Sequence, residues 1–270
     1  IFKAFMSSPA AALQSIENRL VKVKELATSS DRYEDSIEIL EEHQELLTAI
    51  LASSKDSKYA KLKSTLGEMK WSGKKSHDRF VIFAERIATL KYLEENLKRD
   101  FDLADEVVQS FSGSDSDIEQ QAIIEDFGKE DSKVRILLCS DAGSQGVNLH
   151  YYCHQMVNYD IPWSLITLEQ RNGRIDRYGQ KETPNIYYLV AHSDDENIKT
   201  DLHIINKLTE KEEEVYKTLG DAGSVMKLHD SHKEEEVVIS AIENKDENFI
   251  GDISKMDFSS LFAESENTDA

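Results

Sequence analysis

The chain has 270 residues, of which 39% are hydrophobic and 31% charged, and it carries a net charge of -20. This length and composition are typical of a globular protein of one or two domains, and no apolar run approaches the roughly 18 residues that a membrane span needs. The acidic balance argues against a broad electrostatic surface for nucleic acid, so any contact with phosphates must be local.

The first 75 residues predict a helical segment followed by a linker. Two stretches before residue 52 carry apolar side chains at helical spacing, with Ser29-Ser30-Asp31 as a break between them. The apolar positions are Leu13, Ile16, Leu20 and Val23 in the first stretch and Ile37, Leu40, Leu47 and Ile50 in the second. From Ser53 to Ser76 the chain is rich in Lys and Ser, which predicts a short helix and then a linker. Because the chain begins at Ile1 without a Met or a signal-peptide pattern, we expect it to be part of a longer protein.

Over residues 76–192 the pattern changes to an alternation of strands and helices. Short apolar runs predict strands at 80–84, 134–139, 155–159 and 186–190, and a further strand near Val107 and Val108. Amphipathic helices lie between them, at 87–97, at 118–127 and at 165–177. The second of these helices has a cap at Ser116 or Asp117. This order predicts an α/β domain with a parallel sheet covered by helices on both faces.

Residues 193–270 predict an acidic helical extension with a flexible tail. Leu202, Ile205 and Leu208 fall on one helical stripe, while the acidic stretches 212–214 and 234–236 predict solvated segments. The Ser- and Glu-rich end from Asp252 has the composition of a segment that stays disordered until the rest of the protein binds it.

Three loops follow the predicted strands, and in parallel sheets ligands bind at this edge. The loops are Ala84-Glu85-Arg86, Ser112-Gly113-Ser114 and residues 140–148. The third loop holds Gly143 and Gly146, which let a backbone approach a ligand closely, together with hydroxyl and amide side chains that bind phosphate or sugar oxygens. A plain polar turn is the alternative for this loop, because short loops with Gly and Ser are common.

The stretch from Gln170 to Gln180 reads QRNGRIDRYGQ. As a helix that ends at Gly179, it would place Gln170, Arg174 and Arg177 on one face. Two guanidiniums on one face suit a phosphate, because the planar fork of Arg matches its oxygens. The alternative is a solvated helix end with ordinary ion pairs to Asp176 or Glu169.

Two further patterns do not fit the sites they suggest. In GEMKWSGKK, five residues separate Gly67 from Gly73 and Lys75 stands where a Walker A loop needs Ser or Thr, so we expect no such loop here. His150, Cys153 and His154 match no zinc spacing, and we expect no metal site. The chain has only two cysteines, Cys139 and Cys153, which favours a reducing, cytoplasmic location.

Taken in order, these motifs resemble the second motor lobe of superfamily 2 ATPases. The loop with Gly113-Ser114 comes first, the loop at 140–148 second, and a DIPW turn then leads to the arginine motif. Within the superfamily the chain is similar to the Swi/Snf-type group, and its LEQR, GR, DR and GQ segments resemble the bacterial RNA-polymerase-recycling ATPases. The resemblance covers residues 76–192 and implies a RecA-like helicase C-terminal lobe, flanked by helical N- and C-terminal segments.

The resemblance implies which side chains face ATP. Arg174 and Arg177 match the two arginines that reach the γ-phosphate of ATP bound to the other lobe, and Gln170 matches the glutamine that opens this motif. Gly146 and Asn148 match loop residues near the nucleotide. Such an arginine finger stabilises charge on the transferred phosphoryl group. The implied cofactor is ATP with Mg²⁺, bound mainly by the first lobe.

The resemblance also implies contacts to the nucleic-acid backbone. Ser140 matches the Ser or Thr that touches this backbone, and residues of the two other loops match further contacts. Those residues are Phe83, Ala84, Glu85 and Arg86, at and just beyond the end of the first strand, and Gly113 and Ser114 after the second. Asp160 and Trp163 match the D-x-x-W turn of the family. Gln120 stands where many relatives have an arginine, which puts one polar contact in doubt.

The function that the resemblance implies is an ATP hydrolase, as the second lobe of a translocase on double-stranded nucleic acid that remodels protein–nucleic acid complexes. Its partners would be double-stranded DNA or another nucleic acid, the first motor lobe of the same protein, and RNA polymerase or another DNA-bound protein. Because the phosphate-cradling lobe is absent from this sequence, we expect the chain to be inactive alone. The alternatives are a strand-separating helicase lobe and a non-catalytic interaction module.

Overall fold

The computed structural model describes residues 1–28, 31–53, 55–75, 78–144, 146–195, 198, 200–206, 209 and 239. The chain divides into two units. The first unit consists of Ile1–Pro162 and Leu168–Asp195 and contains the strands described below, and the second consists of Trp163–Thr167 and Glu196–Ala270.

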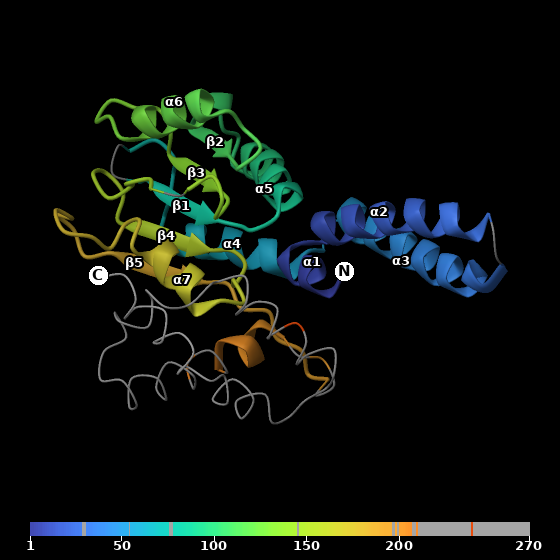
Figure 1. Cartoon of the computed structure of the whole chain (residues 1–270). Helices are drawn as coiled ribbons and strands as arrows, with labels where there is room; N and C mark the ends of the chain where they lie inside the picture. The colour runs from blue at the N-terminus through green and yellow to red at the C-terminus, as the bar shows by residue number, and fades with distance from the viewer. Residues whose placement is uncertain are drawn as a thin grey trace, which may run out of the picture. The chain divides into compact units, whose positions relative to one another are not determined.

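Five parallel strands form one sheet in the order β2-β3-β1-β4-β5 (Figure 1). The strands are β1 Phe80–Phe83, β2 Val108–Phe111, β3 Ile136–Cys139, β4 Gln155–Asn158 and β5 Asn185–Tyr188. A short 3-10 helix, η2 (Asp105–Val107), precedes β2. Phe83 at the end of β1 is level with Cys139 and Asn158, and Phe111 is also level with Cys139. The carboxyl ends of the strands thus lie along one edge, and the predicted α/β class with a parallel sheet is confirmed.

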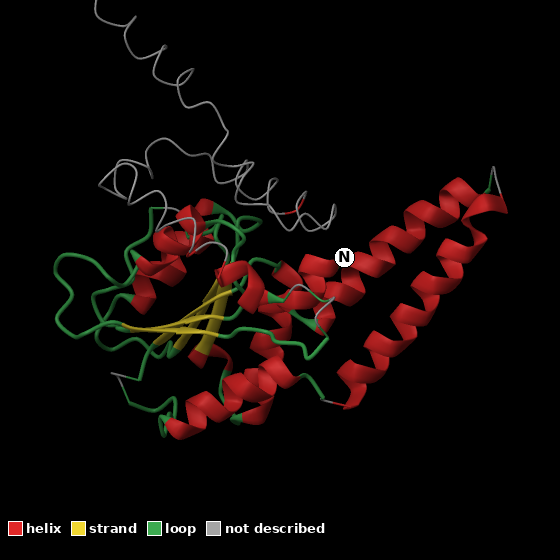
Figure 2. Cartoon of the chain, turned by 90° about the horizontal axis from the view of Figure 1, so that it is seen from below, coloured by secondary structure: helices red, strands yellow, loops and turns green. Residues whose placement is uncertain are grey.

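Helices cover both faces of this sheet (Figure 2). The covering helices are α4 Ser57–Glu68, α5 Ile87–Asp100 and α6 Asp117–Phe127. On one face α4 and α5 share a core with Phe80 and Ile82, and on the other α6 shares a core with Val81 and Phe83. Because β1 is buried on both faces, it needs the continuous apolar run that its sequence shows.

The buried faces of α5 and α6 begin later than the sequence predicted. Ile87 and Ile118 are 41% and 83% exposed, although both stand on the expected apolar stripes. Each lies in the first turn of its helix, and in α5 burial begins at Thr89 and Leu90. The predicted cap of α6 is confirmed, since Ser116 forms a capping box.

Three helices come before this domain in the chain. They are α1 Phe2–Ser7, α2 Pro9–Ala27 and α3 Glu34–Ser53, with a 3-10 helix η1 (Asp31–Tyr33) before α3. Helices α2 and α3 lie side by side (Figures 1 and 2), and their core contains Ala12, Ile16, Leu20 and Leu47 with Leu13, Ile37, Leu40 and Ile50 against it. The two predicted packing helices are confirmed. Ser29 and Ser30 of the predicted break lie outside the described residues.

The stretch around Trp71, where the sequence predicted a linker, is packed onto the sheet. Trp71 is buried and lies edge-on to the rings of Phe80 and Phe101. Its indole N–H donates to the carbonyl oxygen of Asp78 over 2.7 Å. Helix α4 carries Leu62 into the same core. This segment is therefore part of the sheet domain, and its apolar residues anchor the chain to the face that α4 and α5 cover.

In the second unit, Trp163 and Ile204 form a buried pair, with Leu165 and Ile239 packed against it. Trp163 of the D-x-x-W turn thus has a packing role. The predicted stripe is displaced, because Leu202 is exposed and Ile204 is buried.

Several predictions for the C-terminal part fall on Leu208, on 212–214, on 234–236 and on the end from Asp252, which lie outside the described residues. Among the helices that the structure describes, none has the length and apolar character that a membrane crossing needs.

Arg79 is a buried cation held by backbone carbonyls. Its guanidinium donates to the carbonyl oxygens of Phe127, Lys129 and Glu130 over 2.6, 2.6 and 2.9 Å, and lies over the Phe127 ring. These carbonyls stand at the end of α6 and just beyond it, where helical partners are missing. Burial lowers the pKa of Arg79, since the charged form loses its hydration. Arg79 therefore fixes the C-terminal end of α6 on the sheet.

We expect Arg79→Met to lower the free energy of unfolding by about 3 kcal/mol, because buried carbonyls lose a charged donor. Urea denaturation followed by circular dichroism measures this change. Arg19→Met, at an exposed position of α2, is the control and should change stability by less than about 0.5 kcal/mol. Equal effects of the two substitutions would contradict the role of Arg79.

Candidate functional site

A buried arginine, Arg171, lies at the centre of the carboxyl edge of the sheet. It stands near the end of α7 (Leu165–Asn172) and is 1% exposed. Its Nε and Nη2 donate to the two carboxylate oxygens of Asp141 over 2.6 and 2.7 Å. Nη1 donates to the carbonyl oxygen of Asp160 over 2.8 Å and to the Oδ1 atom of Asn158 over 3.3 Å. Such a two-bond pair fixes the direction of both groups.

Asp160 extends this network to the loop after β1. Its carboxylate accepts Nη2 of Arg171 at 3.3 Å and the backbone N–H of Glu85, whose nitrogen lies 3.1 and 2.9 Å from the two oxygens. Glu85 forms an ion pair with Lys3 at 2.6 Å. Burial raises the pKa of the Glu85 carboxyl, and the Lys3 charge acts in the opposite direction. One carboxylate thus joins the loops after β1 and β4 to α7.

Arg171 lies inside the arginine motif, but that motif predicted no role for it. Burial lowers the pKa of its guanidinium, but the hydrogen bonds and charges of Asp141 and Asp160 outweigh burial and raise it. The guanidinium also lies over the Phe83 ring, 5.5 Å from its centre. A sequence signal existed, because Arg171 stands three residues after Leu168 and four before Ile175. That spacing places it on the face that turns toward the core.

The loops after β2 and β3 touch each other at two glycines. A Cβ on Gly113 would lie 2.8 Å from the Cβ of Ala142, and one on Gly143 would lie 2.9 Å from the carbonyl carbon of Ser112. The buried hydroxyl of Ser140 accepts the backbone N–H groups of Gly113 and Gly143 over 3.3 and 3.2 Å. The structure therefore places Ser140 at the junction of the two loops.

The tip of the loop after β2 is accessible. Gly113 and Ser114 are exposed, whereas Phe83 at the end of β1 and Ala84 after it are buried, and Glu85 is half-buried. Arg86, also half-buried, begins the segment that leads into α5.

Gln120 hydrogen-bonds the backbone of the loop after β2. Its amide nitrogen donates to the carbonyl oxygens of Ser112 and Asp115 over 3.0 and 2.8 Å. Gln120, in the first turn of α6, thus hydrogen-bonds the loop that precedes its own helix.

Helix α7 ends at Asn172, so the predicted helix to Gly179 was wrong. The carbonyl oxygen of Arg174 accepts the backbone N–H of Leu149 over 3.1 Å. The carbonyl oxygen of Ile175 accepts the side-chain amide of Gln180 over 3.1 Å. These partners, one distant in the chain and one local, replace the helical ones, and the chain continues as turns.

The turn brings Arg174 and Arg177 to the same segment of the loop after β3. Nη1 of Arg174 donates to the carbonyl oxygen of Val147 over 3.4 Å, and Nη1 of Arg177 donates to the side-chain oxygen of Asn148. Gly146 beside them has a φ of +76°, a conformation that favours glycine. Of the residues predicted to face ATP, Arg177 and Asn148 are in contact, Arg174 contacts the residue before Asn148, and Gly146 belongs to the same loop. Gln170 lies on the exposed side of α7.

Arg174 and Arg177 differ from Arg171 in their partners. Within the described part of the chain, neither forms an ion pair with a carboxylate. Nε of Arg174 is buried without a hydrogen-bond partner. Burial lowers the pKa of Arg174, and the nearby charge of Arg177 adds to this effect. Two guanidiniums in this state can bind an anion, because a phosphate would neutralise both.

His150 and Cys153 each contact neighbouring residues. The ring of His150 stacks on Tyr151 with centroids 4.3 Å apart. The Cys153 thiol lies 3.4 Å from the carbonyl oxygen of Arg79, and burial raises its pKa to about 12. This thiol is therefore protonated at neutral pH.

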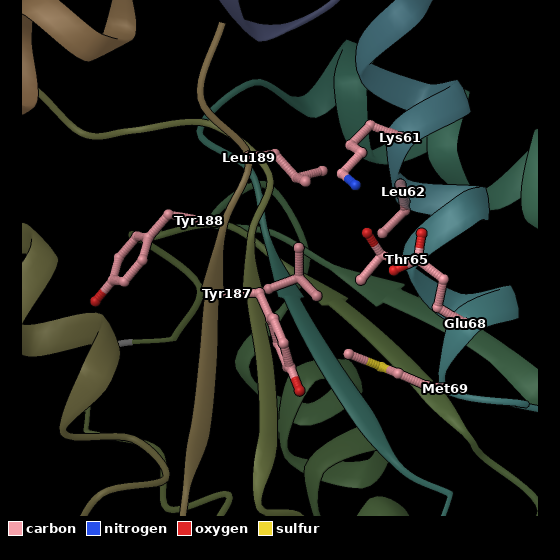
Figure 3. A pocket seen from close by; sticks show the side chains of 9 residues that line it. Lys61, Leu62, Thr65, Glu68, Met69, Tyr187, Tyr188 and Leu189 are labelled. Carbon is pink, nitrogen blue, oxygen red and sulfur yellow. The ribbon is translucent and has the colours of Figure 1, made fainter.

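A pocket of about 280 Å³ lies between α4 and β5, away from the predicted site residues (Figure 3). It is lined by Lys61, Leu62, Thr65, Glu68, Met69, Val157, Tyr187, Tyr188 and Leu189. The ring of Tyr188 lies on the far side of β5 from α4, where its hydroxyl oxygen accepts the side-chain amide of Asn172 over 2.9 Å. None of the residues predicted to face ATP or nucleic acid lines this pocket.

The central region is similar to known proteins. Residues 57–179 match the family described as the helicase conserved C-terminal domain. The chain is 32% identical over 154 residues to the "Uncharacterized ATP-dependent helicase YqhH" of Bacillus subtilis, covering 57% of this chain and 25% of that protein. It is 33% identical over 121 residues to the "RNA polymerase-associated protein RapA" of Vibrio cholerae, covering 44% of this chain and 12% of that protein. The predicted resemblance is confirmed, and the chain spans a quarter or less of these relatives.

Among solved structures, the helicase domain of Hef from Pyrococcus furiosus is 20% identical in sequence to this chain. Its TM-score is 0.48, and the match covers 72% of this chain and 38% of the Hef chain. The matched family region begins at the first residue of α4. It includes the four loops that follow β1 to β4 and the arginine turn as far as Gly179.

We expect Gly143→Ala to lower the free energy of unfolding by about 1–3 kcal/mol, because the added methyl group would force the two loops apart. Gly67→Ala is the matched control. Gly67 lies in α4 with no atom within 4 Å of an added Cβ, so the substitution should stabilise the chain by about 0.5–1 kcal/mol. Thermal or urea unfolding measures both, and a stabilising Gly143→Ala would contradict the close approach.

We expect Arg171→Met to lower the free energy of unfolding by about 3–5 kcal/mol, because Asp141 and Asp160 would lose the charge that compensates them. Arg174→Met should cost no more than about 1 kcal/mol, since Arg174 makes one long hydrogen bond. Urea denaturation of the two variants measures this difference between the two arginines. Equal losses would show that this distinction is unfounded.

Proposed function

We propose that this chain, whose residues 57–179 match the helicase C-terminal domain family, is the second lobe of an ATP-dependent translocase on double-stranded nucleic acid. In this proposal the lobe supplies an arginine finger to ATP bound on a first lobe. It also contacts the nucleic-acid backbone and so helps to remodel protein–nucleic acid complexes. The chain covers a small part of the related helicases, so the catalytic partner lobe would belong to the same longer protein.

The contrast among the three arginines carries this proposal. Arg171 is paired with carboxylates on one side of the turn, while Arg174 and Arg177 have no ion pair within the described residues. Catalysis of phosphoryl transfer needs positive charge that is already oriented before the reaction. Asn148 holds one of the two cations in place without neutralising it.

ATP is the cofactor that we propose for this site, with Mg²⁺ held mainly by the first lobe. The residues present fit a phosphate, because Arg174 and Arg177 converge on the segment from Val147 to Asn148. The side chains of this turn would orient and stabilise the terminal phosphate. Proton transfer and metal binding would fall to residues of the other lobe.

For nucleic acid we propose a narrow contact along the loops after β1, β2 and β3. Gly113 and Ser114 are exposed in the loop after β2, and Arg86 is a half-buried cation in the loop after β1. Few phosphates would be neutralised, so we infer weak binding by this lobe alone that falls steeply with salt. Ser140 would act here through the loops that it joins, since its hydroxyl accepts two backbone N–H groups.

The relatives suggest where such a motor works. One of them carries the name of an RNA polymerase-associated protein. We propose RNA polymerase or another DNA-bound protein as the partner, in a cytoplasmic setting.

In the complete protein, we expect Arg177→Ala to lower the turnover number for ATP by about 10³-fold or more while ATP binding and the fold persist. An exposed side chain contributes little to packing, so its loss should fall on the transition state. Steady-state hydrolysis and nucleotide titration measure the two effects. Lys181→Ala, an exposed cation four residues later, should leave turnover unchanged. If the Arg177→Ala protein kept turnover within about threefold of the parent, the arginine-finger proposal would fail.

A further inference from the structure

The N-terminal helix α1 reaches the carboxyl edge of the sheet with two side chains. The hydroxyl of Ser7 donates to Oδ2 of Asp160 over 2.7 Å in a buried contact. The ammonium of Lys3, whose side chain is 13% exposed, pairs with Glu85 at 2.6 Å. Both partners belong to loops of the candidate site, although α1 lies outside the region that matches the helicase family.

The contact of Ser7 falls on the carboxylate that the network shares. Asp160 accepts Ser7, the backbone N–H of Glu85 and the guanidinium of Arg171. Arg171 in turn holds Asp141 at the start of the loop that ends beside Arg174 and Arg177. A continuous chain of hydrogen bonds therefore runs from α1 to the loop that the two arginines touch.

Ser8 provides a natural comparison within the same segment. The hydroxyls of Ser7 and Ser8 lie 2.8 and 2.7 Å from the hydroxyl of Thr89, and both residues are buried. Ser8 also accepts the N–H of Ala11 as the cap of α2. In the structure Ser7 has the further bond to Asp160, and Ser8 bonds to Thr89 and to the α2 cap.

We propose that Ser7 is a positioning residue for the candidate site, acting through Asp160 on the loop after β1 and on Arg171. This inference rests on the proposed function for its effect on ATP turnover. Its physical basis is independent of that function. A buried carboxylate that loses one donor relaxes toward its remaining donors, and this movement shifts Glu85 and Arg171 together. The N-terminal helix is thus a part of the site rather than an attachment to it.

The first test compares Ser7→Ala with Ser8→Ala in the complete protein. We expect Ser7→Ala to lower the turnover number for ATP about tenfold or more with KM for ATP within about twofold, because displaced catalytic groups act on the transition state. Ser8→Ala should keep turnover within about twofold even though it loses a helix cap. Ser7→Thr keeps a hydroxyl at the same position and should restore turnover toward the parent value.

The second test does not depend on ATP hydrolysis. Hydrogen exchange of the backbone N–H of Glu85 should be about tenfold faster in Ser7→Ala than in Ser8→Ala, because Asp160 accepts this N–H. Equal exchange in the two variants overturns the inference, as does equal loss of turnover. If the parent protein does not hydrolyse ATP, the proposed function fails, and the exchange comparison still decides the role of Ser7.

Discussion

The bidentate pair between Arg171 and Asp141 is the contact on which the carboxyl edge of the sheet depends. It joins α7 to the start of the loop after β3, and the same guanidinium reaches Asp160 after β4. Removing two charges from water is costly, and a buried pair adds stability only where further hydrogen bonds complete it. Here Asn158 and the carbonyl of Asp160 supply them. The pair therefore contributes mainly by fixing the relative positions of the loops.

The turn after α7 determines where the guanidiniums of Arg174 and Arg177 lie. A helix continued to Gly179 would have directed Arg174 and Arg177 along one helical face. Because Leu149 takes the carbonyl of Arg174, the chain leaves the helix and both guanidiniums meet the loop at Val147 and Asn148. The same interruption buries Ile175 completely, which anchors the turn to the core. The early end of α7 thus places the guanidiniums of Arg174 and Arg177 against the loop after β3.

The sequence predicted the sheet well and the ends of its elements less well, for a physical reason. A strand buried on both faces, such as β1 or β3, must be a continuous apolar run, so its signal is local. The end of α7 depends on Leu149, and the packing of Trp71 depends on Phe80 and Phe101, which lie elsewhere in the chain. The role of Arg171 was missed because its partners follow two different strands. Turn motifs and helix propensity depend on neighbouring residues, so they cannot predict partners that are distant in the chain.

Ser7 and Asp160 lie 153 positions apart in the chain. Their hydrogen bond joins a helix outside the family match to a residue inside it. The family match begins at residue 57, yet one oxygen of a carboxylate inside that region is held by a hydroxyl outside it. A hydrogen bond to a buried charge is worth about 1.5–3 kcal/mol, a large share of a typical domain stability of about 5–15 kcal/mol. The region that matches the family therefore lacks one of the donors to its buried Asp160 carboxylate. Because Lys3 holds the neighbouring Glu85 as well, α1 contacts the loops of the site at two points, and the positions of these loops depend on α1.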